Sequence, residues 1–125
     1  MNIVLDAGAL IGIDRDDRRV AGLIELGRRA AARLVTTAPV VGQAWRDGAR
    51  QARLAGALAM IEVRPVALED AKDAGDLLGR AECSDVVDAL VALLAMPGDQ
   101  LLTSDPHDLG PLVDAYHAGV RVVVV

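Results

Sequence analysis

Five aspartates in this sequence occupy positions where a carboxylate can do chemistry. Asp6 directly follows the apolar run IVL, and Asp105 follows the run LLTS. Asp85 and Asp88 are three residues apart in SDVVDALVALL, so both lie on one face of the first turns of an expected helix. Asp108 stands three residues after Asp105. A carboxylate at such a point caps a helix, pairs with an arginine or holds a metal ion, and the surrounding elements decide which.

Short apolar runs separated by helix-length segments must position these acids. The runs are nearly continuous in Val, Ile and Leu, which is typical of strands covered on both faces. We predict strands at residues 3–5, 34–36, 61–63, 100–103 and 121–125. We predict helices at residues 16–32, 39–45, 49–59, 68–80, 84–96 and 106–115. Strands that alternate with helices indicate an α/β fold, a three-layer α/β/α sandwich around a central parallel sheet of about five strands.

Local signals set the expected helix ends. Pro39 marks a helix start, and Gly48 is a break between two helices. Ser84 is the expected N-cap of the helix that carries the paired acids, and Pro97-Gly98 ends that helix.

The predicted topology brings three of the acids together. The carboxyl ends of parallel strands form a ligand crevice, so Asp6 and Asp105 share one sheet edge if both of their strands are central, with Asp88 nearby at a helix start. Converging carboxylates raise one another's pKa, and a divalent cation such as Mg²⁺ or Mn²⁺ relieves the repulsion. The acids therefore favour metal-assisted phosphodiester hydrolysis. Taken alone, Asp6 is as well explained as a helix cap, and Asp85 is better explained by the helix dipole.

Composition limits the function classes. The 125 residues are expected to form one domain, and the net charge of -5 argues against a nucleic-acid binder held by its overall field, while permitting a local basic patch. Only 2% of residues are aromatic, so base stacking on aromatic platforms is not expected. Cys83, the only cysteine, excludes an intramolecular disulfide and a thiolate zinc cluster within one chain, and favours a cytoplasmic setting. No signal peptide and no membrane-length apolar run are found, so we expect no membrane association.

Three motifs follow one another along the chain: LDAGALI near the N-terminus, SDVVDALVALLA in the third quarter and LLTSDPHDL near the end. In this order they resemble a PIN domain, most closely the VapC-type ribonuclease toxins of bacterial type II toxin-antitoxin systems. The resemblance covers essentially the whole chain and implies a PIN-like nuclease domain over residues 1–125 that hydrolyses RNA with Mg²⁺ or Mn²⁺. It implies metal ligands at Asp6, Asp88 and Asp105, with Asp85 as a supporting catalytic acid.

The same resemblance implies protein partners. A small cognate antitoxin would occupy a groove with its C-terminal segment, and the toxin would form a homodimer. Apolar residues around Val40, Val41 and Trp45 are the expected dimer surface.

One acid of the family pattern is missing. A glutamate in the helix after the second strand is expected within APVVGQAWRDG, and Gln43 stands there. Glutamine offers a neutral oxygen and adds no charge for metal binding, and Glu82 is the candidate replacement. This departure favours a rival interpretation, a degenerate PIN domain that binds RNA or a protein partner without cleavage.

Other polar residues are candidate substrate contacts. Gln43 can position a water, and Ser104, together with Thr103, can bond the Asp105 carboxylate or a phosphate.

Three arginines form a second candidate contact. Arg46, Arg50 and Arg53 are spaced by four and three, so they line one face if a single helix continues through Gly48. Such a face would contact RNA phosphates, although a solvated helix face explains it equally well.

Other sites and enzyme classes fit less well. His107 and His117 lack partners at ligand spacing, which argues against a zinc site or a histidine base. A haloacid-dehalogenase-like phosphatase needs a second acid where Gly8 stands. A receiver domain needs a lysine after a late strand, whereas Lys72, the only lysine, falls in a predicted helix.

Overall fold

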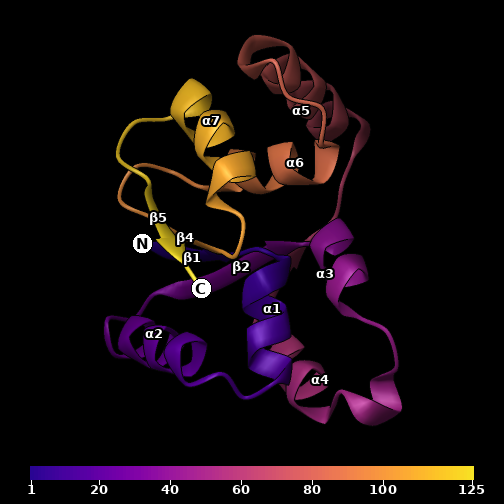
Figure 1. The fold of residues 1–125 in the computed structure, drawn as a ribbon, viewed down its shortest axis with the longest axis vertical. Helices are drawn as coiled ribbons and strands as arrows, with labels where there is room; N and C mark the ends of the chain where they lie inside the picture. Colours follow the sequence, from indigo (N-terminus) through magenta and orange to yellow (C-terminus); the bar gives the residue numbers. More distant parts are fainter.

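The computed structural model describes residues 1–125, and its elements alternate as predicted, with one helix that the sequence did not indicate. Figure 1 shows them in chain order. The strands are β1 (Asn2–Leu5), β2 (Arg33–Thr37), β3 (Glu62–Arg64), β4 (Gln100–Thr103) and β5 (Arg121–Val124). The helices are α1 (Ala7–Asp14), α2 (Arg18–Arg29), α3 (Ala38–Ala44), α4 (Ala52–Leu58), α5 (Leu68–Ala81), α6 (Val86–Leu94) and α7 (Pro106–Tyr116), with a short 3₁₀ helix, η1 (Gly48–Arg50). None of these helices is both long and apolar enough to cross a membrane.

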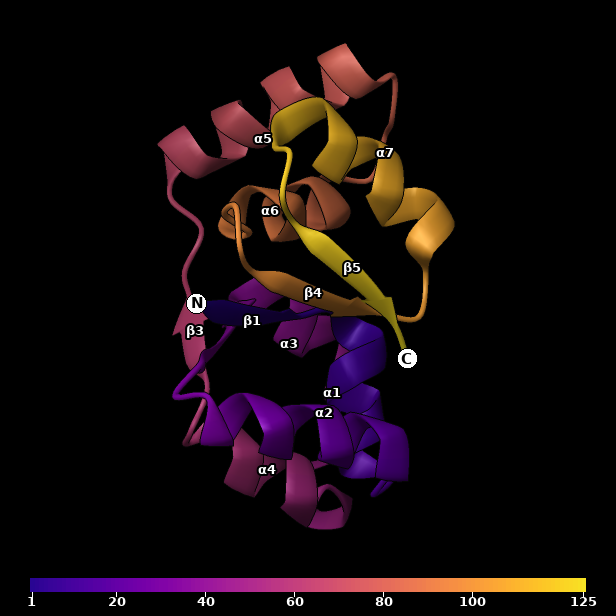
Figure 2. The same cartoon turned by 90° about the vertical axis from the view of Figure 1, so that its left-hand side faces the viewer.

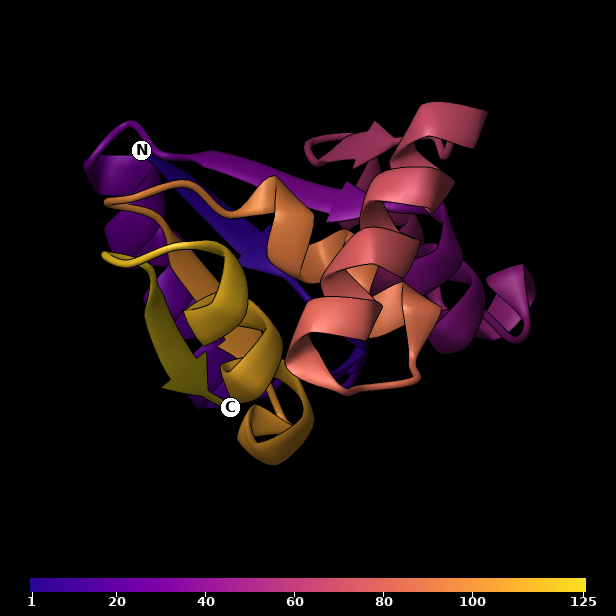
Figure 3. The ribbon, with the colours of Figure 1, turned by 90° about the horizontal axis from the view of Figure 1, so that it is seen from above.

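The five strands form one parallel sheet in the order β3-β2-β1-β4-β5. Helices α1 to α4 cover one face, and α5 to α7 cover the other (Figure 2). Figure 3 views the second layer from above, with α6 lying closest to the sheet. The predicted three-layer α/β fold with a five-stranded parallel sheet is confirmed.

The core explains why the central strands are almost purely apolar. One cluster of 22 buried side chains runs through both layers of helices and the sheet. Strands β1 and β4 supply much of it, including Ile3, Leu5, Leu101 and Leu102, because helices press on both of their faces. Covered strands need no polar alternation, as their sequences show.

The edge strand β3 departs from this pattern. Glu62–Arg64 is shifted by one residue from the predicted strand, and all three of its residues are exposed. The expectation that every strand is covered on both faces is therefore wrong for β3. The strand pairs on one side only, with β2, and charged residues suit such an edge.

Helix α1 was not predicted. Its sequence, AGALIGID, has two glycines and no polar face, so the amphipathic period that marks a surface helix is missing. No residue of α1 is exposed, because the helix packs between the sheet and helices α2, α3 and α4. Packing against the sheet and three helices, and not amphipathicity, accounts for this helix.

Several predicted helix ends are corrected. The helices predicted at 16–32, 49–59 and 84–96 are shorter by two or three residues at one or both ends, and the third already ends at Leu94, before Pro97-Gly98. The N-cap of α6 is Asp85, one residue beyond the expected Ser84, and its carboxylate accepts a hydrogen bond from the Asp88 N–H at 3.1 Å. Helix α3 begins at Ala38, one residue before the predicted start, with the Thr37 hydroxyl accepting from the Val40 N–H, and it ends at Ala44, one residue before the predicted end. The chain then forms an extended turn and η1 before α4.

Candidate active site

Strand order places two of the acids side by side. Strands β1 and β4 are neighbours, Leu5 pairs with Leu102, and the Asp6 N–H extends the ladder by donating to the Leu102 carbonyl at 3.0 Å. Asp6 and Asp105 therefore leave adjacent strands at their carboxyl ends. The strand order runs outward from β1 to β3 on one side and from β4 to β5 on the other, so it reverses between β1 and β4. Open parallel sheets bind ligands at such a point.

The Asp6 carboxylate is not a helix cap. Asp6 occupies the N-cap position of α1, yet its side chain accepts no hydrogen bond from that helix. The side chain is buried, and its Oδ2 accepts a hydrogen bond from the Thr103 hydroxyl at 2.8 Å. Capping, the alternative explanation for Asp6, thus has no support in its contacts.

Asp88 experiences the charges of all the other acids. It lies half-buried in the first turn of α6. Burial, followed by the negative charges of Asp85, Asp6, Asp108 and Asp105, raises its pKa to about 7. The carboxylates after β1, at the start of α6 and at the start of α7 therefore interact electrostatically. We call this group, Asp6, Asp85, Asp88, Asp105 and Asp108, the acidic cluster.

The start of α7 adds a second interacting pair. Asp105 is the N-cap residue of α7 and makes no side-chain capping bond. The pKa of Asp108 is raised by a hydrogen bond with the Asp105 carboxyl group and by its negative charge, while His107 opposes the shift. Asp108 lies exposed in the first turn of the helix, as expected.

Part of the acidic cluster lines a pocket of about 330 Å³ between α6 and α7. Asp85, Asp88 and Asp108 contribute carboxylates, and His107 lies exposed among them. Asp6 and Asp105 are not part of this lining. The sequence indicated that His107 is a surface residue, but its place beside the acids depends on how α7 packs on α6, which residue spacing did not reveal. The half-buried Cys83, expected to be a small buried residue, lines the same pocket.

The acidic cluster suits a divalent cation by its chemistry, but it is not a closed cage. No group of three or more carboxylate, histidine or cysteine side chains stands close enough together to hold a metal ion. Mg²⁺ commonly binds one or two carboxylates and keeps several waters, so it does not need such a cage. The raised pKa of Asp88 marks a place where positive charge would be stabilised.

The candidate substrate residues are scattered. Gln43 lies exposed near the end of α3, and its side chain makes no hydrogen bond. Ser104 is also exposed. Thr103 was expected to bond the Asp105 carboxylate or a phosphate, but it bonds the Asp6 carboxylate and the Asp105 N–H instead. Glu82, the suggested replacement charge, is exposed and is not among the carboxylates that act on Asp88.

The arginine face required one helix to continue through Gly48, and this condition is not met. Because α3 ends before Arg46, the three arginines do not lie on one helix. Arg46 bonds the carbonyls of Gly42 and Trp45 at 3.0 and 2.7 Å. Arg50 pairs with Asp47 at 3.7 Å, and Arg53 with Asp16 at 4.0 Å.

Gln51 organises this turn and was missed in the sequence. Its buried side chain accepts hydrogen bonds from the N–H groups of Arg46 and Asp47 at 2.7 and 2.9 Å, and donates to the Ala44 carbonyl at 3.0 Å. A glutamine in a polar segment carries no sequence signal for such a role.

Comparison with known proteins supports the fold. No family model matches the sequence, and no curated protein matches it. A chain of VapBC2 from Rickettsia felis, bound to a DNA fragment from their promoter, superposes with a TM-score of 0.68. The match covers 100% of this chain and 99% of that chain at 11% identity. At this identity the likeness shows a common fold, the PIN-like architecture that the motifs led us to expect.

Proposed function

We propose that this protein is a divalent-metal-dependent endoribonuclease, the toxin of a type II toxin-antitoxin pair. One observation carries the proposal: on a fold shared with a VapBC2 chain, acids from three separate segments act on one another at the carboxyl ends of β1 and β4. The acidic cluster would repel an anionic ligand that binds without a cation. It therefore favours a divalent cation that binds together with a phosphodiester substrate.

Asp6, Asp88 and Asp105 would hold Mg²⁺ or Mn²⁺, with Asp85 close by. When bound, the metal supplies an activated water and neutralises charge on the scissile phosphate. The carboxylates would hold and orient the ion, and their negative charges would repel an RNA phosphate unless a cation lay between them. Gln43 and Ser104, both exposed, are proposed to contact the RNA or an ordered water.

A cleavage assay tests the proposal. Purified protein is incubated with structured RNAs in Mg²⁺ or Mn²⁺, with EDTA, and as the Asp6→Asn variant. We expect cleavage by the wild type that EDTA abolishes and Asp6→Asn reduces at least about 100-fold, since the variant loses one of the carboxylates proposed to hold the metal. A broad panel of cellular RNAs left intact with either metal would contradict it.

A second candidate function is RNA or protein binding without cleavage. It is favoured by Gln43, which places no charge where the family pattern has a glutamate. Retained binding of RNA by a protein that cleaves none of the panel would establish this function in place of the first.

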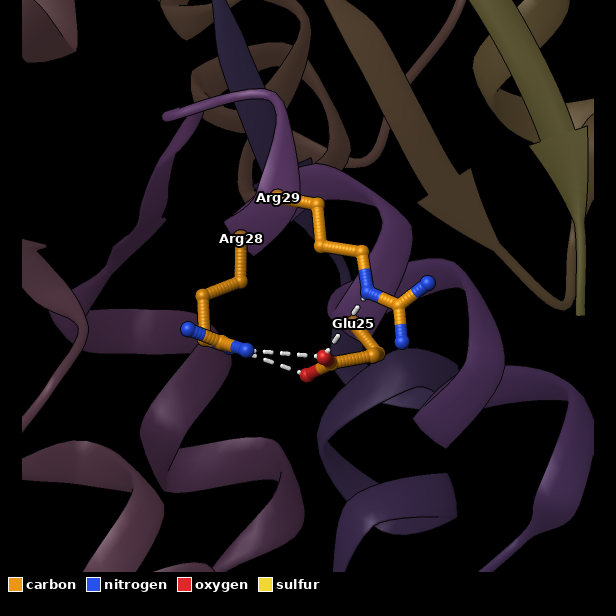
Figure 4. A network of polar contacts seen from close by, with 3 residues as sticks. All are labelled: Glu25, Arg28 and Arg29. Carbon is orange, nitrogen blue, oxygen red and sulfur yellow. Dashed lines mark hydrogen bonds and ion pairs between the residues drawn. The ribbon is translucent and has the colours of Figure 1, made fainter.

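A groove on the side of the sheet away from α6 and α7 suits the proposed antitoxin. Two adjoining pockets of about 480 and 360 Å³ share Ile24, Leu34 and Met60, which form an apolar floor between α2 and the end of α4. Met60 is 74% exposed, a large fraction for an apolar side chain. Arg28 and Glu25 stand at the rim, where Glu25 bonds both Arg28 and Arg29 (Figure 4).

The chemistry of this groove selects its occupant. Both arginines and acids line the two pockets around this floor, namely Arg28, Arg33, Arg53, Asp16, Asp17, Glu25 and Glu62. Such a groove fits a peptide that carries apolar side chains flanked by charged residues of both signs. We propose that a segment of a cognate antitoxin binds here, by analogy with the toxin-antitoxin complex that shares this fold.

The homodimer is also proposed, but its expected surface must be revised. Val40 is fully buried in the core, and Val41 is half-buried. Trp45 is 36% exposed, with its ring against Gly48. Only Trp45 is therefore free to contribute an exposed apolar face.

A further inference from the structure

One buried hydroxyl joins the two acids at the ends of β1 and β4. Thr103 is fully buried, and its Oγ1 donates to Asp6 Oδ2 at 2.8 Å. The same oxygen accepts from the Asp105 N–H at 2.9 Å. A hydroxyl has one donor and two acceptor sites, so it makes both bonds at once.

These bonds fix different properties of the two acids. The bond to Asp6 has a carboxylate acceptor in a buried place, which strengthens it and orients the carboxylate. The bond to Asp105 holds that residue's backbone in a non-helical conformation, with φ -130° and ψ 68°, just before α7 begins. Thr103 thus sets both the direction of one acid and the path of the segment that carries the other.

A second, independent contact presses the same two turns together. A Cβ atom at Gly8 would lie 2.6 Å from the Ser104 Cβ and 2.9 Å from the Ser104 backbone nitrogen. Gly8 lies in the first turn of α1, two residues after Asp6, and Ser104 directly precedes Asp105. The turn after β1 therefore approaches the turn after β4 more closely than any side chain at position 8 allows.

We propose that Thr103 and Gly8 are positioning residues that set the orientation of Asp6 and the placement of Asp105 for binding a divalent ion. This inference rests on the proposed metal-dependent function. Neither residue touches the ion: Thr103 acts through its bonds to the acids, and Gly8 acts by letting their turns approach.

Thr103→Val tests the first half, with Mn²⁺ alone as the probe. Valine keeps the shape of threonine but has no hydroxyl, so both bonds are lost. We expect Mn²⁺ affinity, measured by titration calorimetry, to fall about 10–100-fold, the usual cost of removing a group that supports a metal ligand. Thr103→Ser keeps the hydroxyl and should restore most of the affinity.

The chain offers a matched control in Thr36. It is equally buried, and its hydroxyl donates to the Leu5 carbonyl at 2.6 Å without contacting a carboxylate. Thr36→Val should alter thermal stability much as Thr103→Val does, yet leave Mn²⁺ affinity within about twofold of the wild type, since no acid loses a hydrogen bond.

A metal-free readout follows from the second bond. The Asp105 N–H should exchange with solvent slowly in the wild type and in Thr103→Ser, and faster in Thr103→Val, measured by NMR without any metal. This measurement needs only folded protein, so it separates the hydrogen-bond claim from metal binding.

Gly8→Ala tests the second half. An added methyl group should push the two turns apart and weaken Mn²⁺ binding at least about tenfold, by the same loss of ligand positioning. Gly22→Ala in α2 is its control, because a Cβ there meets nothing within 4 Å, and it should leave Mn²⁺ binding unchanged.

The outcomes separate the inference from the proposed function. A wild type that does not bind Mn²⁺ overturns the proposed function, and with it this inference. A wild type that binds Mn²⁺ while Thr103→Val and Gly8→Ala bind it equally well overturns the inference alone. Equal losses in Thr36→Val and Thr103→Val, or no rescue by Thr103→Ser, would also overturn it, because they indicate general loosening of the core.

Discussion

At the scale of single residues, the acids of the acidic cluster have different roles although they share one chemistry. Asp6 and Asp105 occupy N-cap positions without capping, whereas Asp85 caps α6. A carboxylate that caps nothing is free to bind a cation. Asp85, whose carboxylate caps α6, is therefore the supporting acid, in agreement with the structural role that the sequence indicated for it.

Asp85 can be tested by separating its oxygen from its charge. Asp85→Asn keeps an oxygen that caps α6 and should leave the free energy of unfolding within a few tenths of a kcal/mol, while Asp85→Ala should lose about 1 kcal/mol. Both variants remove a negative charge, so both should lower the pKa of Asp88. Urea denaturation and an NMR titration of Asp88 measure these effects. Equal stability of the two variants would show that the cap contributes nothing.

Asp88 predicts an unusual dependence of stability on pH. Its pKa in the folded protein is raised from 3.8 to about 7, so the folded state holds a proton that the unfolded state has released. Its contribution to stability is complete below pH 3.8 and is lost as the pH rises through about 7. In EDTA, the thermal midpoint of the wild type should therefore fall more from about pH 5 to about pH 8 than that of Asp88→Asn.

Metal provides the control for this pH effect. Saturating Mn²⁺ at about pH 8 should raise the thermal midpoint of the wild type, because a ligand that binds only the folded state stabilises it. Asp88→Asn should gain much less. Parallel pH profiles for the two proteins in EDTA would show that Asp88 titrates normally.

Residue types and spacing located the acids but not their partners. Asp6 and Asp105 could be read from the sequence because each ends an apolar run, and strand ends are visible in a pattern. Thr103 as their link and His107 beside Asp88 could not, because they depend on strand order and on the packing of α7 against α6. Neither is encoded in local spacing.

At the scale of elements, the burial of each strand or helix explains whether its sequence pattern predicted it. The central strands were predicted to within a residue or two because continuous apolar runs mark covered strands. Helix α1 was missed because it is buried and lacks a polar face. The non-helical segment between α3 and α4 is longer than the single break predicted at Gly48. The Gln51 side chain holds this segment by hydrogen bonds, which helix propensity does not describe.

Because β4 is a central strand and β3 an edge strand, we expect truncation of their side chains to lower the free energy of unfolding by different amounts. Leu102 on β4 is fully buried, so Leu102→Ala should destabilise the protein by about 2–5 kcal/mol through lost burial and a cavity. Val63 on the edge strand β3 is 36% exposed, and Val63→Ala should cost less than about 1.5 kcal/mol. Urea denaturation of both variants checks this difference. Similar losses would argue against the strand order found here.

At the scale of the whole molecule, the two proposed functions lie on different sides of the sheet. The acidic cluster lies at the carboxyl ends of β1 and β4 and on the α6–α7 side, while the apolar groove lies among α2, α4 and β2. A partner in the groove need not touch the acids to bind. Recognition and chemistry should therefore be separable by mutation.

Met60→Glu tests this separation. A charge on the exposed floor of the groove should weaken binding of the protein encoded by a neighbouring antitoxin-like reading frame at least about tenfold, because a carboxylate would be desolvated there. RNA cleavage should be unchanged. Leu26→Glu is the control, since Leu26 is 64% exposed on α2 but lines neither pocket of the groove. Equal binding by both variants would place the partner elsewhere.

The overall architecture could be predicted from the sequence, whereas the assembled site could only be outlined. Alternating strands and helices gave the α/β class, and motif order gave the PIN-like fold that the structure shares with a VapBC2 chain. The apolar groove was not located, because its floor comes from Ile24, Leu34 and Met60, which lie far apart in the sequence. Surfaces assembled from separate elements become visible only in three dimensions.

The central claim is that the carboxylates at the ends of β1 and β4 bind a divalent cation. Crystals grown with MnCl₂ and measured at the manganese absorption edge test it most directly. The account predicts an anomalous peak about 2.0–2.3 Å from carboxylate oxygens of Asp6, Asp88 or Asp105, absent in crystals of Asp6→Asn. Manganese bound elsewhere, or no peak in this cluster at saturating Mn²⁺, would contradict it.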